Sequence, residues 1–249
     1  MQHKKILVIG DSCRDVFVYC DAQRLCPDVP VPVLNIMDQT ENPGMAKNVQ
    51  RNISALGISC DCITNTNWHD LTKTRYVHRK TNHMFVRVDS RNSIERVDLS
   101  ALDYHYDAIV VSDYNKGFLH WEDIQAVCQS HPLVFVDTKK PVGTWLSDAK
   151  FIKINDTEYL NSKLTITPEI DKKIIRTMGE RGCRFRGKDY AVDRVEVQDV
   201  SGAGDTFLAG LVVGYLKRED IEEAIRFANL CASEVVRHRG VTVPKEPMR

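Results

Sequence analysis

The chain has 249 residues, 43% of them hydrophobic and 27% charged, a composition typical of a globular protein and unlike that of a disordered one. Thirty-four basic residues balance thirty-four acidic ones, so no bulk positive charge favours a nucleic-acid partner. No run approaches the roughly 18 apolar residues of a membrane span, and the apolar stretch at residues 6–9 is too short for a signal peptide. We therefore expect a cytoplasmic protein without a membrane partner.

The eight cysteines and eight histidines show no C-x-x-C pair and no spacing typical of a zinc site. Thiols inside strand-like segments behave as small apolar side chains. We therefore expect free cysteines and assign no metal ion to either residue type.

Short apolar runs alternate with amphipathic helical patterns along most of the chain. The runs typical of strands buried on both faces of a parallel sheet are residues 5–9, 107–111, 133–136 and 151–154. Helices are expected at residues 46–56, 121–130, 203–216 and 221–238. This alternation predicts an α/β fold with right-handed crossovers between parallel strands.

Three other segments favour antiparallel strands. Residues 13–38 contain two extended stretches, and residues 73–89 have the alternation of a hairpin. A further hairpin is predicted at 183–193, with its turn at Gly187-Lys188. We expect one α/β domain, residues 1–249, with a small antiparallel β-lid formed from about 13–38 and 73–89.

The strongest chemical signal is the sequence D-V-S-G-A-G-D-T-F, which leads into an apolar helix. At a helix N-terminus, the N–H groups of Gly202, Ala203 and Gly204 form a site for an anion, most naturally a phosphate. Asp205 then lies where a carboxylate receives a proton from a hydroxyl that attacks phosphorus. The alternative is a helix cap in which Ser201 is the N-cap and Asp205 complements the helix dipole.

This sequence resembles the C-terminal signature of the ribokinase-like (PfkB) carbohydrate kinases, and four more segments match that family's motifs in order. They are Gly10-Asp11 with Asp15, the segment N-P-G-M-A-K-N-V at 42–49, N-D-T-E at 155–158 and T-M-G-E-R-G at 177–182. The chain is thereby identified as a member of this family. The resemblance implies a three-layer α/β/α body with a mostly parallel central sheet, a small β-sheet lid, and ATP-dependent phosphorylation of a sugar hydroxyl.

The resemblance also implies roles for individual residues. Asp205 would be the general base and the Gly202–Gly204 amides the anion hole. ATP would lie near Asn155, Thr177, Gly179, Gly182 and Asn229. Mg²⁺ would be held largely through water by Asn155 and Glu158, and a monovalent cation is a further candidate. For Asn155 and Glu158, a helix cap with a solvated acid is the alternative.

Sugar hydroxyls require carboxylate and amide partners, and the residues that match the family's sugar-binding segments are Asp11, Asp15, Gly44 and Asn48. Taken singly, each of these also suits a turn or a cap. A phosphorylated acceptor requires cations as well. The candidates in and around the substrate site are Arg75, Arg87, Asp113, Lys116 and Lys139, and each basic one is alternatively a solvated charge.

Within the family, the finer resemblance is to the heptose-7-phosphate kinase subgroup. It is carried by C-P-D-V-P-V-P-V at 26–33, S-D-Y-N-K-G at 112–117, D-T-K at 137–139, F-A-N at 227–229 and G-V-T at 240–242. The subgroup implies transfer to the anomeric hydroxyl of a heptose 7-phosphate, giving the 1,7-bisphosphate. A kinase for another sugar or a nucleoside, and a non-catalytic descendant that binds a sugar phosphate, remain as alternatives.

The sequence departs from the family pattern at two places. Met45 replaces a glycine where the backbone normally meets the sugar, and the segment 159–176 is too short for the usual helical crossover. From these 249 residues we expect the kinase reaction alone, without a nucleotidyltransferase reaction. The exposed edges of a lid sheet need covering, which favours a homodimer formed through the lid.

Overall fold

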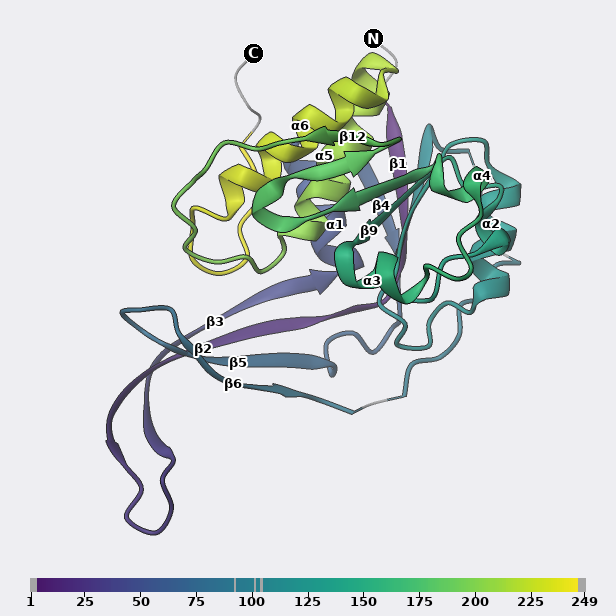
Figure 1. Ribbon diagram of the computed structural model, residues 1–249. Helices are drawn as coiled ribbons and strands as arrows, with labels where there is room; N and C mark the ends of the chain where they lie inside the picture. The colour runs from purple at the N-terminus through teal and green to yellow at the C-terminus, as the bar shows by residue number, and fades with distance from the viewer. Residues whose placement is uncertain (1–3, 92, 101, 104, 246–249) are drawn as a thin grey trace.

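The computed structural model describes residues 4–91, 93–100, 102–103 and 105–245. It has two parts (Figure 1). The body contains an eight-stranded sheet in the order β12-β11-β10-β9-β8-β7-β1-β4, and the lid is a four-stranded sheet in the order β3-β2-β5-β6. Neighbouring strands from β4 to β10 are parallel, whereas β11 and β12 add to the edge as an antiparallel hairpin.

The body strands confirm the four predicted apolar runs, with small shifts at their ends, and include two strands, at 59–63 and 174–177, that were not among those runs. They are β1 (Lys5–Gly10), β4 (Ser59–Ile63), β7 (Ala108–Asp113), β8 (Val134–Thr138), β9 (Phe151–Asn155), β10 (Ile174–Thr177), β11 (Cys183–Phe185) and β12 (Lys188–Tyr190). Successive residues of a strand point to opposite faces. Ile6 and Val8 therefore enter one hydrophobic core and Leu7 the other, which is why a central strand such as β1 has apolar residues on both faces.

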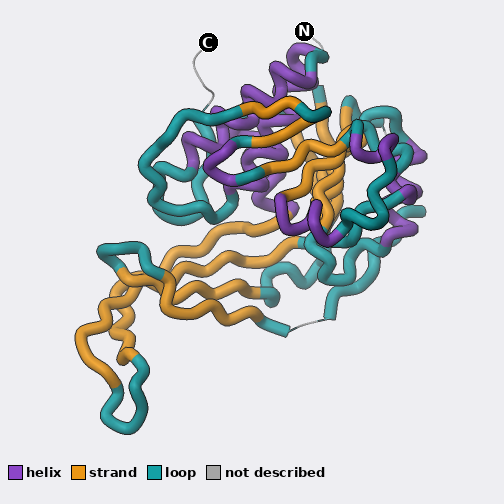
Figure 2. The backbone as a smooth tube through the Cα atoms, viewed as in Figure 1, coloured by secondary structure: helices purple, strands orange, loops and turns teal. Residues whose placement is uncertain are grey.

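Helices cover both faces of this sheet and make the three layers (Figure 2). The helices that share the first core are α1 (Ala46–Ala55), α5 (Ala203–Arg218) and α6 (Ile221–Val235). The second core is covered by α2 (Trp121–Ser130), the 3₁₀ turn η1 (Thr144–Leu146) and α4 (Pro168–Asp171). Helix α6 ends three residues before the predicted His238, because the chain then turns so that Arg239 donates to the carbonyls of Arg79 and Lys80 in the lid.

The crossover from β9 to β10 is short, as the sequence indicated. It contains α3 (Asp156–Asn161) and α4, of six and four residues. The 3₁₀ turn η2 (Gly179–Arg181) then precedes the β11–β12 hairpin. Its turn is centred on Arg186 and Gly187, one residue earlier than predicted, because these two residues adopt the positive φ angles that a tight hairpin requires.

The lid consists of β2 (Ser12–Leu25), β3 (Pro32–Met45), β5 (Thr72–His78) and β6 (Met84–Asp89), so it extends beyond the predicted boundaries. The expectation of a purely antiparallel sheet is wrong, since β2 and β5 pair in parallel. The reason is the route of the chain, which returns to the body through α1 and β4 before it enters β5. A parallel pair needs such a crossover.

The lid lies against the carboxyl ends of the central strands. Only Asp11 separates β1 from β2, and the Asn82 side chain donates to the Gln198 carbonyl of the body at 2.6 Å. Phe17 of the lid packs against Val241. In parallel α/β sheets, ligands bind at the carboxyl ends of the strands, so this junction is where a site is expected. In the described part of the chain, no helix has the length and apolar character needed to cross a membrane.

Candidate active site

A glycine occupies the N-cap position of α5 and sets the geometry of its N-terminus. Gly202 is the N-cap residue, with a left-handed φ of 80°, and a Cβ atom there would lie 2.9 Å from Asn48 Nδ2. No side chain caps the helix, so the alternative of Ser201 as the N-cap is wrong. The Ala203 N–H donates to the Val200 carbonyl at 3.2 Å. The amides of Gly202 and Gly204 are therefore the better candidates for an anion site.

Asp205, in the first turn of α5, is a buried carboxylate with two protein donors. Asn48 Nδ2 of α1 donates to Oδ2 at 2.9 Å, and the Tyr114 hydroxyl donates to Oδ1 at 2.6 Å. Burial raises the pKa of Asp205, although both hydrogen bonds lower it. The helix that offers amides to an anion thus also holds a carboxyl group of increased basicity.

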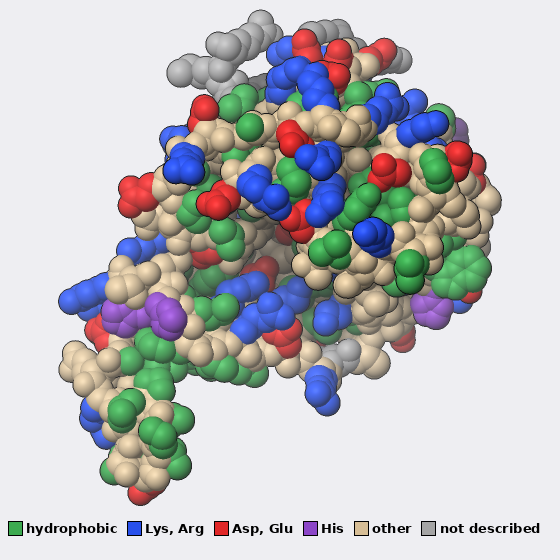
Figure 3. All heavy atoms as spheres, viewed as in Figure 1, with side chains coloured by type: hydrophobic (Ala, Val, Ile, Leu, Met, Phe, Trp, Pro, Cys, Tyr) green, Lys and Arg blue, Asp and Glu red, His purple; other side chains and the backbone are tan. Residues whose placement is uncertain are grey.

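These groups face a cavity of about 290 Å³ that is lined by residues of the body. Figure 3 shows a hollow between body and lid around which charged side chains gather. The lining residues of the cavity are Tyr114, Lys139, Lys153, Asn155, Thr177, Gly179, Gly202, Gly204 and Asp205. The structure therefore brings together residues from the N-x-x-E, T-x-G-x-x-G and G-A-G-D segments. Tyr114 and Lys153 are members that the sequence analysis did not select.

Lys153 of β9 is 4% exposed, and its Nζ lies 2.6 Å from Asp137 Oδ2. The same ammonium group would lie 3.2 Å from a Cβ atom on Gly204, so it adjoins the anion site. Asp137 Oδ1 is buried without a hydrogen-bond partner among the described residues. The sequence carried a signal for this pair, namely a lysine inside the apolar strand F-I-K-I-N, because lysine is rarely buried unless it is paired.

Asn155 and Glu158 cap α3. The Asn155 side chain accepts from the Glu158 N–H at 2.9 Å, and Glu158 Oε2 accepts from the Asn155 N–H at 2.8 Å. Lys139 pairs with the other oxygen of Glu158. Although burial disfavours the charged amine, Asp137 and Glu158 together raise the pKa of Lys139. The capping alternative is thus present, and the acid is paired with a lysine rather than solvated.

The oxygen donors beside this lysine suit Mg²⁺, which prefers carboxylate, carbonyl and water ligands. The unpartnered Oδ1 of Asp137 is the clearest candidate, with Asn155 and Glu158 nearby. Over the described ranges, no three His, Cys, Asp or Glu residues form a group that holds a metal ion. A Mg²⁺ ion here therefore depends on nucleotide oxygens and water as well as on the protein.

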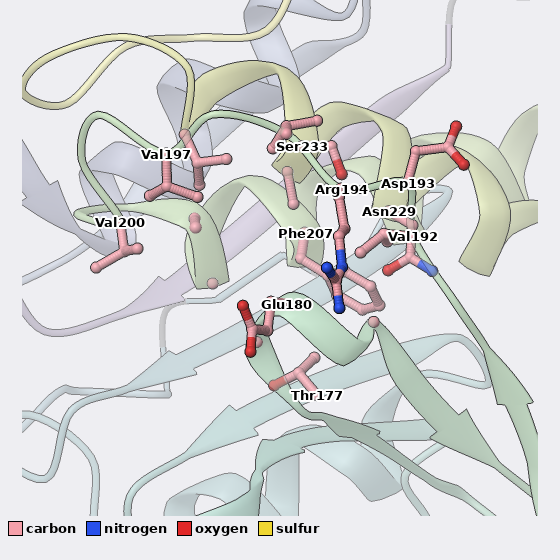
Figure 4. A pocket seen from close by; sticks show the side chains of 17 residues that line it. Thr177, Glu180, Val192, Asp193, Arg194, Val197, Val200, Phe207, Asn229 and Ser233 are labelled. Atoms are coloured by element: carbon pink, nitrogen blue, oxygen red, sulfur yellow. The ribbon is translucent and has the colours of Figure 1, made fainter.

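A second cavity, of about 730 Å³, adjoins the first and shares Thr177, Gly179 and Gly204 with it. It is lined by all of Thr177, Gly179, Gly182 and Asn229 (Figure 4). A Cβ atom on Gly182 would lie 2.1 Å from the Tyr190 carbonyl oxygen, so this position requires glycine. Asn229 donates to the same carbonyl at 3.0 Å. The wall is largely apolar, as a site for a nucleotide base requires.

The lid face toward the body carries charged residues in register. Arg75 donates to Asp15 Oδ1 at 2.5 Å, and Gly44 leaves room for this carboxylate, since a Cβ atom there would lie 2.6 Å from Oδ2. Arg87, directly opposite Arg75 on the neighbouring strand, forms a two-point ion pair with Asp89. Like charges opposite each other are unfavourable unless an anion balances them.

The carboxylates of Asp11 and Asp113 are bonded to other groups of the protein. Asp11 accepts from the Tyr114 N–H at 2.7 Å, whereas Asp113 pairs with Lys140 at 2.8 Å. Both carboxylates are buried, and neither lines the two cavities described above. They hold the turn after β7, on which Lys116 is exposed. Asn48, predicted as a sugar ligand, donates to the carboxylate of Asp205.

The fold is that of the ribokinase-like proteins. The structure of ribokinase from Thermotoga maritima superposes with a TM-score of 0.72 at 17% identity, covering 97% of this chain and 96% of that one. Phosphofructokinase-2 from Escherichia coli, solved in complex with potassium, gives a TM-score of 0.70 at 13% identity, covering 98% and 96%.

Sequence comparison defines the family. Residues 105–248 match the pfkB family of carbohydrate kinases. The bifunctional protein HldE of Helicobacter pylori strain J99 is 31% identical over 95% of this chain, and that of Vibrio parahaemolyticus is 28% identical over 97%. The chain spans 64% and 62% of the length of these two relatives. It belongs to the pfkB family of carbohydrate kinases, which are ATP-dependent phosphotransferases.

Proposed function

We propose that the protein transfers the γ-phosphoryl group of ATP to a hydroxyl of a sugar phosphate, and specifically to the anomeric hydroxyl of a heptose 7-phosphate. The observation that carries the proposal is the buried carboxylate of Asp205 beside the Gly202 and Gly204 amides, in a cavity that adjoins the larger nucleotide-sized one. The likeness to HldE proteins supports the choice of acceptor.

In the proposed reaction, ATP lies along Thr177, Gly179, Gly182 and Asn229, with its terminal phosphate toward α5. The acceptor oxygen attacks phosphorus, a new P–O bond forms, and the bond to the leaving ADP oxygen breaks. The acceptor proton passes to Asp205. The amides of α5 and the Lys153 ammonium group stabilise the negative charge on the migrating phosphoryl group, which is the main catalytic demand of such a transfer.

If Mg²⁺ is bound together with the nucleotide, it would supply positive charge that offsets the charge of the phosphates. Asp137, Asn155 and Glu158 would hold it, in part through water. The ion pair between Lys139 and Glu158 leaves room for exchange, because an ammonium group on a flexible stem can turn from the carboxylate to a phosphate oxygen. Lys139 was predicted as a cation for a phosphorylated substrate, and we interpret it as a contact for a phosphate oxygen.

The arginines of the lid supply the reason to propose a phosphorylated acceptor. Arg75 and Arg87 lie opposite each other on neighbouring lid strands, and the nearby Asp15 and Asp89 balance them without the acceptor. A phosphate dianion would satisfy both guanidinium groups at once. A free sugar or a nucleoside offers no such group, so the lid charge favours a sugar phosphate.

We expect Arg87→Leu to raise the KM for a phosphorylated acceptor about 10-fold or more, with little change in the KM for ATP, because one charge-assisted contact is worth about 1.5–3 kcal/mol. Arg184→Leu is the matched control, since Arg184 forms the same two-point pair with Asp189 on the hairpin edge of the body. Steady-state kinetics check the prediction. Equal effects of both variants would refute a phosphate site on the lid.

The acceptor itself is tested by ATP consumption with heptose 7-phosphate, other sugar phosphates, free hexoses, pentoses and nucleosides. The proposal expects turnover with heptose 7-phosphate and much less with the unphosphorylated sugars. A preference for a free sugar or a nucleoside would favour the alternative of a kinase for another sugar or for a nucleoside. Absence of both Mg-ATP binding and turnover would favour a non-catalytic sugar-phosphate-binding protein.

We further propose that two copies associate through the lid. Large apolar side chains are exposed along the projecting β2–β3 hairpin and on β6 (Figure 3). They are Leu25, Val29, Val31, Ile36, Met37, Met84, Val86 and Val88. A second copy of this sheet has the complementary apolar surface, and the edges of both lids would gain cover.

Analytical ultracentrifugation at micromolar concentration is expected to give a dimer, and Ile36→Asp to give a monomer, because a carboxylate would be buried in the interface. Leu164→Asp is the control, since Leu164 is fully exposed on the body. A monomeric parent protein, or a dimer that survives Ile36→Asp but not Leu164→Asp, would place the contact elsewhere.

A further inference from the structure

The phenol of Tyr114 covers the carboxylate that would act as the base. Its hydroxyl lies 2.6 Å from Asp205 Oδ1, while Asn48 occupies Oδ2. A general base must bring the acceptor hydroxyl to about 2.6–3.2 Å. The Tyr114 hydroxyl already lies at this distance and donates the same kind of O–H···O bond.

The backbone of Tyr114 is fixed, and its ring lies between the lid and the body. Its N–H donates to the buried carboxylate of Asp11 at 2.7 Å, which anchors the turn. The ring is approached by two lysines, Lys73 of the lid at 4.7 Å and Lys139 of the body at 5.2 Å from the ring centre. Both lysines have flexible stems, and the ring also packs against the small apolar cluster of Cys13, Met45 and Leu71. Displacement of the phenol therefore requires the lysines to move aside and the ring to shift against this cluster.

The Tyr114 hydroxyl also stays protonated and therefore remains a hydrogen-bond donor. Burial, and then the negative charge of Asp205, raise the pKa of Tyr114 far above its ordinary value. The phenol therefore keeps its proton at neutral pH, and it cannot take a proton from an acceptor in place of Asp205. Its chemistry is limited to donating a hydrogen bond to the carboxylate.

We infer that the Tyr114 hydroxyl takes the place of the acceptor hydroxyl on Asp205 and that the acceptor must displace it before transfer. The inference rests on the proposed role of Asp205 as the base. With Tyr114 in place, one acceptor position of Oδ1 is taken and the phenol covers this side of the carboxylate, so a water molecule has less access to it as a base. Bound ATP is then protected from hydrolysis until a sugar arrives, and part of the acceptor's binding energy is used to move the phenol.

The test is Tyr114→Phe, which removes the displaced group and keeps the ring. Hydrolysis of Mg-ATP without acceptor is expected to rise about 10-fold, because water gains access to Oδ1. The KM for the acceptor is expected to fall about 3- to 10-fold, as one charge-assisted hydrogen bond no longer has to be broken. The kcat with acceptor should change less than about 3-fold, since Tyr114 has left Asp205 by then.

Tyr106→Phe is the matched control, because the Tyr106 hydroxyl donates to Asp61 at 2.8 Å, away from both cavities. Tyr106→Phe should change neither the rate of acceptor-free hydrolysis nor the kcat with acceptor. A fall in kcat with unchanged KM in Tyr114→Phe would show that Tyr114 remains bonded to Asp205 during transfer, and unchanged acceptor-free hydrolysis would show that it protects nothing; either result overturns the inference. The acceptor-free rate is measured whether or not a sugar phosphate is phosphorylated, so failure of the inference and failure of the proposed function are distinguishable.

Discussion

Asp205→Asn is expected to lower kcat by about 10²-fold or more, because the amide cannot take the acceptor proton. The side-chain oxygen of asparagine still accepts from the Tyr114 hydroxyl, whereas its amide nitrogen replaces the oxygen that accepts from Asn48, so one hydrogen bond is lost and the side-chain volume is kept. Asp205 does not line the larger cavity, and the KM for ATP should therefore change little. Steady-state kinetics with Mg-ATP and the best acceptor check this, and near-normal turnover would remove Asp205 from the mechanism.

The thermal stability of Asp205→Asn tests whether its loss of turnover is caused by misfolding. Burial raises the pKa of Asp205 above its ordinary 3.8, so ionising this group costs more in the folded protein than in the unfolded chain. Its contribution to stability is therefore greatest below pH 3.8 and is lost as pH rises through the folded pKa. Asp205→Asn removes this cost and also loses the hydrogen bond from Asn48; because burial outweighs that bond in raising the pKa of Asp205, the variant should melt at pH 7 no lower than the parent protein does.

The pH dependence of catalysis is opposite to that of stability: the contribution of Asp205 to stability falls as pH rises, whereas its contribution to kcat increases. The base acts only when ionised, so the kcat of the parent protein should fall as pH falls through the raised pKa of Asp205. A variant that melts below the parent at pH 7 would show that the carboxylate stabilises the fold.

Continuous apolar runs and a period of 3.6 were sufficient to predict most strands and helices of the body, because their apolar faces are set by local sequence. The pairing of β2 with β5 was not predictable in this way. Its parallel direction depends on the chain passing through α1 and β4 first, which is a property of the whole topology. The early end of α6 likewise depends on contacts between Arg239 and the lid.

For the candidate site, sequence motifs selected groups that do lie together, such as Thr177, Gly204 and Asp205. They also selected Asp11 and Asp113, whose carboxylates are bonded to the turn after β7. A motif records that a carboxylate is present at a strand end but not which way it points. Contacts between distant segments decide that, and they are also what joins Lys153 to the site.

Lys153→Met is expected to have two separable effects. Removal of the ammonium group leaves Asp137 as a buried charge without its close partner, which costs about 3–5 kcal/mol in the free energy of unfolding. It also removes a positive charge beside Gly204, where the migrating phosphoryl group is proposed to lie, so kcat should fall by about 10²- to 10³-fold. Urea unfolding and steady-state kinetics measure the two effects.

Two further variants separate a structural from a catalytic cause. Lys153→Met with Asp137→Asn removes both charges, so it should regain most of the lost stability but none of the lost turnover. Lys140→Met breaks the comparable buried pair with Asp113, which does not line either cavity, and should lose stability with far less loss of kcat. If turnover instead follows stability across all three proteins, the ammonium group of Lys153 only balances Asp137, and the charge of the phosphoryl group must be met by the α5 amides and Mg²⁺ alone.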